Sequence, residues 1–145
     1  MVKLAIVTPA YNRADLLPRL FESLKRQTDC SFKWYIIDDG STDNTEEVCK
    51  GFAPDKFDIL YMHKENGGKH TALNHALKAV EEDLTIIVDS DDYLSDDAVE
   101  TICRDWRSYE SCKDVAGMSY YKSFTTGRLV GDGFVEDYHK DSHIN

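Results

Sequence analysis

Four short apolar runs along the chain predict β-strands. They occupy residues 4–7, 32–37, 59–62 and 85–88. Short unbroken runs that are rich in β-branched residues are typical of strands buried on both faces of a sheet. The fourth run leads directly into Asp89, Asp91 and Asp92, so three carboxylates follow the end of a predicted buried strand. In open α/β folds, ligands bind at this end of the sheet.

Apolar residues also recur at helical spacing between and after the predicted strands. The predicted helices lie within residues 16–24, 42–52, 71–80 and 95–106. Asn12 or Asp15 is expected to cap the first of them, and a further apolar segment, residues 115–121, predicts a fifth strand. The alternation of strands and helices predicts an α/β fold with three layers, α/β/α, in which helices cover both faces of a mostly parallel sheet.

The composition narrows the class of protein. A chain of 145 residues, of which 41% are hydrophobic and 30% charged, is expected to form one globular domain. Its formal net charge of -10 argues against nucleic acid as a partner, because nucleic-acid-binding proteins carry a basic footprint. An acidic protein that handles an anionic substrate needs a metal ion or a local cluster of donors.

Cysteine usage and hydropathy indicate a cytoplasmic protein. The four cysteines lack metal-ligand spacing and are expected to be reduced thiols. No apolar stretch approaches the ~20 residues that a membrane span needs, and the N-terminal segment lacks the pattern of a signal peptide. We expect any peripheral contact with a membrane to come through a bound substrate or through further parts of the protein.

Three of the four predicted strands end in polar residues, namely Thr8 with Tyr11, Asp38 with Asp39, and Asp89 with Asp91. Because the carboxyl ends of parallel strands are neighbours, these side chains should line one pocket suited to a nucleobase, a ribose and phosphates. We expect Tyr11 to stack on a base and Asp39 to accept hydrogen bonds from a base N–H or a ribose hydroxyl. Residues 38–41 also fit an ordinary turn and helix cap, and this alternative stays open.

The acidic residues after the fourth strand have the spacing of a metal site. Asp89 and Asp91 are two residues apart, so their side chains leave an extended backbone on the same side. Two adjacent carboxylates repel each other unless a cation lies between them. Oxygen ligands of this kind suit Mg(II), Mn(II) or Ca(II). The histidines are not expected to bind a metal, since His70 and His75 do not share a helix face.

Four sequence blocks together resemble a known family. They are VTPAYNR (residues 7–13), IIDDGSTD (36–43), NGGKHTALNHAL (66–77) and VDSDDYL (88–94). In this order and at these separations they resemble the family-two nucleotide-sugar glycosyltransferases of GT-A fold, a Rossmann-like architecture. The resemblance covers about residues 2–121. It implies that residues 1–145 form the N-terminal, nucleotide-sugar-binding part of such an enzyme.

The resemblance also implies roles for individual positions. Thr8, Pro9 and Tyr11 match positions that line the nucleobase pocket, and Asp39 matches the acid that binds a uracil-type base edge. Lys69 and Asn74 match the block beside the diphosphate and sugar of the donor. Within the DxD motif, Asp89 and Asp91 match the acids that hold the metal and the donor. Ser90 lies between them and is expected to contact the donor, and Asp92 is expected to support the pair.

The implied reaction is an inverting, metal-dependent sugar transfer. The donor would be a nucleotide diphosphate-sugar, UDP-sugar by preference, and the acceptor a hydroxyl of a carbohydrate or a lipid-linked molecule in bacterial-type surface polysaccharide synthesis. A divalent cation, Mn(II) or Mg(II), would neutralise the departing diphosphate, and Lys69 would add a point charge to the same phosphates.

The general base that inversion needs is not identified in the chain. Glu136 and Asp137 form an acidic pair, but it lacks the surrounding pattern of the family and is not assigned as the base. We expect the base and the acceptor region beyond Asn145. A chain truncated in this way is expected to expose an apolar sheet edge through which copies could associate.

Two other functions stay open at this stage. A nucleotidyltransferase would use the same acidic pair to hold a triphosphate, but the PAYNR segment lacks the glycines that such enzymes carry after their first strand. A non-catalytic module that only binds a nucleotide-sugar is the second alternative, because the base is unidentified.

Overall fold

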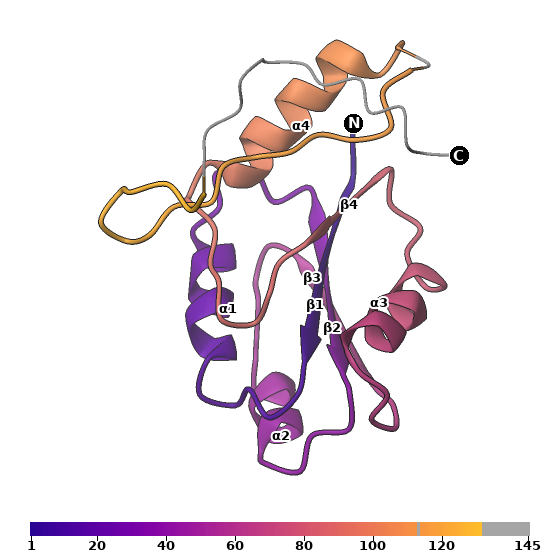
Figure 1. Cartoon of the computed structure of the whole chain (residues 1–145), viewed down its shortest axis with the longest axis vertical. Coiled ribbons are helices and arrows are strands. Elements are labelled where there is room, and N and C mark those ends of the chain that lie inside the picture. The colour runs from indigo at the N-terminus through magenta and orange to yellow at the C-terminus, as the bar shows by residue number, and fades with distance from the viewer. Residues whose placement is uncertain (113, 132–145) are drawn as a thin grey trace. The chain divides into compact units, whose positions relative to one another are not determined.

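The computed structural model describes residues 1–112 and 114–131. The chain divides into two compact units, Met1–Ser111 and Cys112–Asn145. The first unit contains a four-stranded parallel sheet of order β3-β2-β1-β4 (Figure 1). Its strands are β1 (Leu4–Ala10), β2 (Phe32–Asp38), β3 (Asp58–His63) and β4 (Leu84–Ile87), and its helices are α1 (Leu17–Lys25), α2 (Thr45–Lys50), α3 (Lys69–Leu77) and α4 (Ala98–Tyr109).

The order and register of the strands gather the predicted polar ends at one edge of the sheet. β1 lies between β2 and β4 and pairs with both in parallel, Ala10 opposite Asp38 and Val7 opposite Ile87. Two backbone hydrogen bonds extend the pairing by one residue, from Asp39 N to Ala10 O (2.8 Å) and from Val88 N to Val7 O (3.0 Å). Asp39 and Asp89 therefore begin the loops on the two sides of β1.

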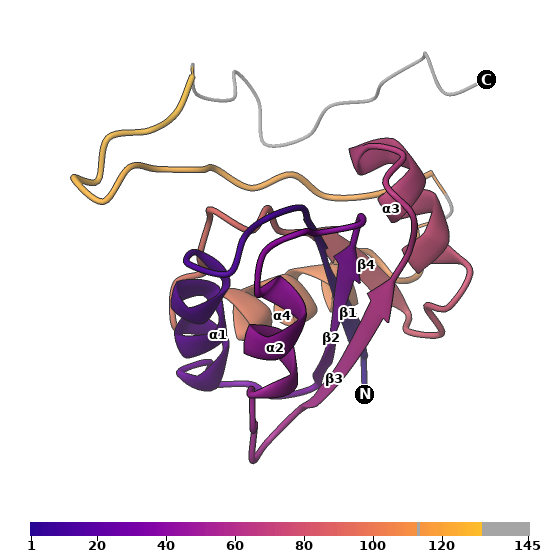
Figure 2. The same cartoon turned by 90° about the horizontal axis from the view of Figure 1, so that it is seen from below.

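The helices cover the two faces of the sheet with different kinds of core. In Figure 2, α1, α2 and α4 lie on one face and α3 lies on the other. On the first face the ring of Phe21 stacks on Phe52 (centroids 4.4 Å apart) and Trp34 (6.2 Å). On the second face the core combines the buried ring of Tyr35 with small and aliphatic residues of β1, β2 and α3, such as Val7, Ile37, Ala72 and Ala76. This arrangement confirms the predicted α/β/α fold with a parallel sheet.

The prediction that residues 85–88 form a strand buried on both faces is wrong. Ile87 is 55% exposed, and Thr85 is exposed as well. In the parallel register these two residues lie opposite Ala5 and Val7, whose side chains face α3. Because α3 packs mainly on β1 and β2, it leaves this face of β4 uncovered. The exposure thus follows from the strand order, which the apolar run by itself does not specify.

The predicted fifth strand is also absent from the described residues. Residues 115–121 have no regular structure, and the second unit instead forms a short antiparallel turn with a bridge between Ser123 and Leu129. The Phe124 amide donates to the Arg128 carbonyl (2.8 Å), and Gly127 adopts φ +81° within the turn. An apolar segment becomes a strand only where a neighbouring strand offers its hydrogen-bonding edge.

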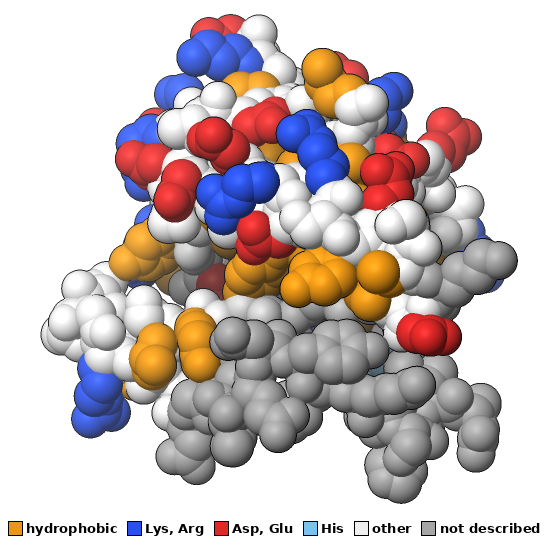
Figure 3. Space-filling view, turned by 90° about the horizontal axis from the view of Figure 1, so that it is seen from above, with side chains coloured by type: hydrophobic (Ala, Val, Ile, Leu, Met, Phe, Trp, Pro, Cys, Tyr) orange, Lys and Arg blue, Asp and Glu red, His pale blue; other side chains and the backbone are white. Residues whose placement is uncertain are grey.

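Charged side chains of both signs share the surface. On the face shown in Figure 3, Lys and Arg side chains are interspersed with Asp and Glu. Exposed ion pairs such as Arg26 with Asp96 (3.1 Å) contribute about 0–1 kcal/mol each, so burial of the two cores holds the fold together. Among the helices of the described residues, none is long and apolar enough to span a membrane.

Candidate functional site

A cavity of about 240 Å³ opens at the carboxyl edge of the sheet. Its lining comes from the end of β1, the loops after β1, β2 and β4, and the start of α3. It consists of Pro9, Ala10, Tyr11, Arg13, Asp39, Lys69, Asp89, Ser90 and Asp91. This is the place at which open parallel sheets bind ligands. Polar and ionisable side chains dominate the lining, which suits a ligand that carries charged and hydrogen-bonding groups.

Thr8 and Asn74 are the two predicted site residues that do not line this cavity. Thr8 is fully buried, and its hydroxyl accepts a hydrogen bond from Trp34 Nε1 (2.9 Å) on the face that carries α1 and α2. Asn74 is exposed on α3. The other predicted residues, Pro9, Tyr11, Asp39, Lys69, Asp89, Ser90 and Asp91, come together around the cavity.

Asp39 is a buried carboxylate that is fixed from several sides. Only 4% of the residue is exposed. Its Oδ1 accepts hydrogen bonds from Lys64 Nζ (2.5 Å) and the Gly67 amide (3.0 Å), and its Oδ2 accepts one from the Gly68 amide (2.7 Å). Burial alone would raise the pKa of Asp39, but the bonds from Lys64 and the two amides outweigh burial and lower it. The carboxyl group is therefore ionised at neutral pH.

The neighbouring Asp38 serves the turn instead of the cavity. Its Oδ1 accepts a hydrogen bond from the Ser41 amide (2.8 Å) and its Oδ2 accepts one from the Tyr61 hydroxyl (2.6 Å). Burial would raise the pKa of Asp38, yet these bonds lower it. Residues 38–41 thus combine the two predicted roles: Asp38 stabilises an ordinary turn, and Asp39 lines the cavity.

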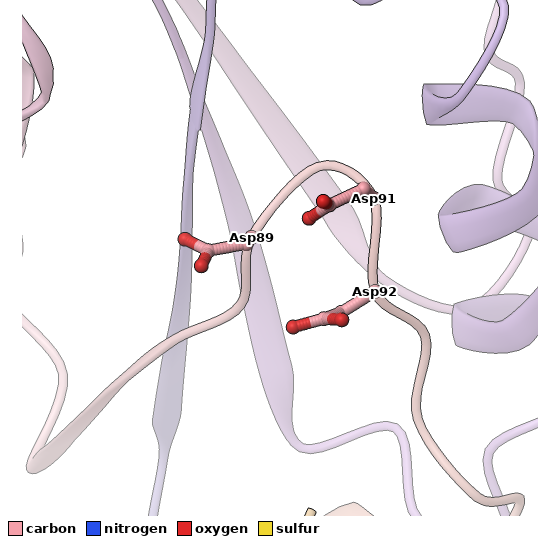
Figure 4. Close-up of side chains that lie close together, drawn as sticks. All are labelled: Asp89, Asp91 and Asp92. Atoms are coloured by element: carbon pink, nitrogen blue, oxygen red, sulfur yellow. The ribbon is translucent and has the colours of Figure 1, made fainter. Parts of the chain in front are cut away.

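The loop after β4 presents a cluster of three carboxylates, defined by Asp89, Asp91 and Asp92. One oxygen of each lies within 4.8 Å of the others, and Figure 4 shows that all three side chains extend toward the same side of the turn. A hydrogen bond from Asp92 N to Asp89 O (3.0 Å) closes this turn. Hard divalent cations prefer such a set of oxygen donors. Among the described residues this is the one group of three or more metal-ligating side chains so placed.

Lys69 places a positive charge beside this cluster. It is the first residue of α3, and its Nζ lies 2.5 Å from Asp89 Oδ1. Both side chains are accessible, with 55% of Lys69 and 40% of Asp89 exposed. The loops on the two sides of β1 thus differ in chemistry: the loop after β2 holds the fixed acceptor Asp39, and the loop after β4 holds an acidic cluster paired with an exposed cation.

Buried polar groups in and just after α1 hold the segment that follows the acidic cluster. The Gln27 side chain, just beyond α1, donates to the Ser95 carbonyl (2.6 Å) and accepts from the Val99 amide (3.0 Å). The Ser23 hydroxyl accepts from the Leu94 amide (3.3 Å). These bonds fix residues 94–99 to α1, so the acidic turn is anchored at its start by β1 and after its end by α1.

Asn12 joins the loop after β1 to the loop after β2. The prediction that it caps α1 is wrong, because Leu16 occupies the N-cap position and no side chain caps the helix. Asn12 instead adopts φ 52°, and its Oδ1 accepts hydrogen bonds from the Thr42 amide (2.8 Å) and the Asp43 amide (3.3 Å). This connection fixes the backbone next to Tyr11 against the loop after β2.

Sequence reasoning missed two cations at the site, Arg13 and Lys64. Arg13 lines the cavity, and Lys64 bonds to Asp39. A signal for Lys64 existed, since it follows a predicted strand and directly precedes the Glu65-Asn66-Gly67-Gly68 turn. Its distance of 25 residues from Asp39 in the chain concealed the pairing. Glu136 and Asp137, the acidic pair that was not assigned as a base, lie outside the described residues.

Comparison with known proteins assigns the chain to a family. The family model described as "Glycosyl transferase family 2" matches residues 5–132. The glycosyltransferase GlyA of Streptococcus pneumoniae is 31% identical over 148 residues, which cover 98% of this chain and 21% of GlyA. The chain thus spans about a fifth of the length of this relative.

Two solved structures share the fold. S. aureus TarS 1-349, crystallised in complex with UDP, aligns with a TM-score of 0.70 at 25% identity over 84% of this chain and 39% of TarS. The mannosyltransferase PcManGT from Pyrobaculum calidifontis, in complex with GDP-Man and Mn²⁺, aligns with a TM-score of 0.59 at 25% identity over 63% of this chain and 28% of PcManGT. The chain belongs to glycosyl transferase family 2, and its parallel α/β sheet has the GT-A fold.

Proposed function

We propose that this chain is the nucleotide-sugar-binding part of a glycosyltransferase that moves a sugar from a nucleoside diphosphate-sugar, UDP-sugar by preference, to an acceptor hydroxyl. The observation that carries the proposal is the cavity itself, whose lining combines the fixed acceptor Asp39 with Lys69 and two carboxylates of the acidic cluster, Asp89 and Asp91. TarS in complex with UDP and PcManGT in complex with GDP-Man support a ligand of this class.

The lining suggests how the donor is held. Tyr11, 47% exposed at the rim, offers a ring on which a base can stack. Asp39 accepts a hydrogen bond from the base through the acceptor position left on its Oδ2. Lys69 and Arg13 supply positive charge for the two phosphates, and Pro9 and Ser90 complete the wall. Thr8 supports this wall from the core, and Asn74 lies nearer the outer end of the donor.

The acidic cluster fits a divalent cation, Mn(II) or Mg(II). Its donors are all carboxylate oxygens, they lie within 4.8 Å of one another, and one residue of the three, Asp91, is exposed. Asp89 and Asp91 would hold the ion, with Asp92 beside them. When bound, such an ion neutralises the charge that develops on the departing diphosphate. PcManGT with Mn²⁺ supports this assignment.

The transfer itself is proposed to invert the configuration at the sugar. The acceptor oxygen forms a bond to the anomeric carbon while the bond from that carbon to the diphosphate oxygen breaks, and a general base takes the hydroxyl proton. We place that base, with the acceptor site, beyond Asn145. Within this chain Tyr11, Asp39 and Lys69 bind and orient the donor.

The cellular setting is proposed from the class of reaction. We propose a cytoplasmic enzyme that reaches a carbohydrate or lipid-linked acceptor at the membrane periphery and serves bacterial surface polysaccharide synthesis. The uncovered face of β4 around Ile87 is a candidate surface for contact with a further part of the protein or a second copy.

Calorimetric titration of the chain with UDP in the presence of Mn(II) tests the proposal. We expect binding that Asp39→Ala and Asp91→Ala each weaken at least about tenfold, because each removes a charged contact. Asp55→Ala, which removes an exposed carboxylate outside the cavity, should bind like the wild type. Wild-type affinity in both cavity variants would refute the proposal. Pyrophosphate release from a sugar phosphate and a nucleoside triphosphate would favour a nucleotidyltransferase instead.

A further inference from the structure

Lys64 is a partly buried cation that pairs with Oδ1 of Asp39. Only 17% of its side chain is exposed, compared with 5% for that of Asp39. Its Nζ donates to Asp39 Oδ1 (2.5 Å), to Thr71 Oγ1 (2.9 Å) and to the Glu65 carbonyl. An ammonium group has three protons, and each has an acceptor here. The side chain is therefore fully engaged inside the protein and, unlike Lys69, does not line the cavity.

The contacts of Asp39 leave one acceptor position of its carboxylate without a partner in the protein. A carboxylate offers about four acceptor positions, two on each oxygen. On Oδ1 both are taken, by Lys64 and the Gly67 amide, and on Oδ2 one is taken, by the Gly68 amide. The remaining position belongs to Oδ2 of a residue that lines the cavity. Rotation of the carboxylate would break the bond to Lys64, so its orientation is fixed.

The same lysine ties Asp39 to the start of α3. Thr71 Oγ1 accepts from Lys64 and donates to the Gly68 carbonyl (2.8 Å). A Cβ added at Gly67 would lie 2.7 Å from Thr71 Oγ1 and 3.3 Å from Lys64 Nζ, so this turn closes tightly over the lysine. Lys64 therefore sets the geometry of the acid and of the two amides that hold it.

We propose that Lys64 is a positioning residue that makes the base end of the cavity selective for uracil over cytosine. The inference rests on the proposed function, since it takes a nucleoside diphosphate as the ligand of the cavity. Uracil presents a donor at N3, which a fixed and ionised carboxylate accepts. Cytosine presents an acceptor at N3, and a carboxylate in that place repels it. Lys64 keeps Asp39 ionised and fixed in orientation, which is the state that favours uracil over cytosine.

Loss of the lysine should change both the charge and the freedom of Asp39. Without Lys64 the buried carboxyl group keeps two amide donors and no cation, and burial then favours its protonated form. A protonated carboxyl group can donate to cytosine N3 and accept from the cytosine amino group. Binding of UDP should therefore fall much more than binding of CDP. A merely structural lysine would lower both affinities by the same factor, because local unfolding of the site affects the two ligands equally.

The test is to titrate UDP and CDP, with Mn(II) present, into the full chain and its Lys64→Met variant. We expect the variant to bind UDP about 10-fold to 100-fold more weakly while CDP changes by less than about threefold. Lys50→Met is the matched control, because Lys50 also pairs at 2.5 Å with a carboxylate, Glu46, but on the exposed side of α2. Its ratio of UDP to CDP affinity should equal that of the wild type.

Thr71→Val provides a second test that does not depend on the folding of Lys64→Met. Valine keeps the shape of threonine and removes one acceptor of Lys64, so the affinity ratio should contract by about threefold. If the wild type prefers UDP and both Lys64→Met and Thr71→Val keep its ratio of UDP to CDP affinity, the inference is overturned and the proposed function stands. A wild type that binds neither nucleotide would overturn both.

Discussion

Replacing Lys69 with methionine should change two binding constants in opposite directions. In the structure Lys69 Nζ lies 2.5 Å from Asp89 Oδ1, so the ammonium group competes with a divalent cation for that oxygen. Because 55% of Lys69 and 40% of Asp89 are exposed, solvent screens the pair and its worth is about 0.5–1 kcal/mol. Without it, Mn(II) alone should bind about twofold to fivefold more tightly.

The same change should weaken binding of the nucleotide. When Mn(II) saturates the acidic cluster, Lys69 is free to contact the diphosphate. Loss of this charged contact should lower the affinity for UDP about 10-fold to 100-fold. Free Mn(II) is measured by electron paramagnetic resonance, and UDP by calorimetry. Lys50→Met should alter neither constant, because Lys50 pairs with Glu46 on α2. A lower affinity for Mn(II) in Lys69→Met would show that the ammonium group does not compete with a divalent cation for Asp89.

Three further predictions concern stability. Gln27→Leu should lower the free energy of unfolding by about 2–4 kcal/mol in urea titrations, because it leaves the Val99 amide and the Ser95 carbonyl without their partner; a loss below about 0.5 kcal/mol would disprove the anchoring role. Gly40→Ala should lower the free energy of unfolding by about 1–3 kcal/mol, because φ is +78° and the new Cβ would lie 2.7 Å from Asn66 N. Gly127→Ala should lower it less, because Gly127 has a similar φ of +81° but open space around the new Cβ. The lowered pKa values of Asp38 and Asp39 mean that their contribution to stability is present above the unfolded pKa, about 3.9, and is lost as the pH falls through the folded value. The free energy of unfolding, measured from pH 7 to pH 3, should therefore decline less in Asp38→Asn than in the wild type. An equal decline in the two proteins would contradict a contribution of ionised Asp38 to stability.

The parts of the fold that depend on local pattern could be predicted from the sequence. The apolar runs before Thr8, Asp38 and Asp89 specify strands, and the carboxyl ends of parallel strands lie at the same edge of a sheet. The acids at those ends could therefore be assigned to one site. The family resemblance is confirmed by the family model that matches residues 5–132.

The remaining features depend on contacts between distant residues. The exposure of Ile87 follows from the place of β4 in the sheet, and the partner of Asp39 follows from how the turn before α3 folds back onto β2. Asn12 resembles a helix cap in sequence, but a positive φ directs its side chain to the neighbouring loop. The apolar residues 115–121 lack a strand to pair with among the described residues. None of these outcomes is encoded in a short window of sequence.

Paramagnetic broadening of amide signals by Mn(II) tests most directly whether metal and nucleotide meet at the carboxyl edge of the sheet. With UDP present, substoichiometric Mn(II) should selectively broaden the amide signals of Asp89, Asp91, Asp92 and Lys69, together with the phosphorus signals of UDP. The Asp91→Asn variant should lose this selectivity. Broadening spread over the exposed acids of the surface, such as Asp96 and Asp97, or absent from the UDP phosphates, would contradict the account.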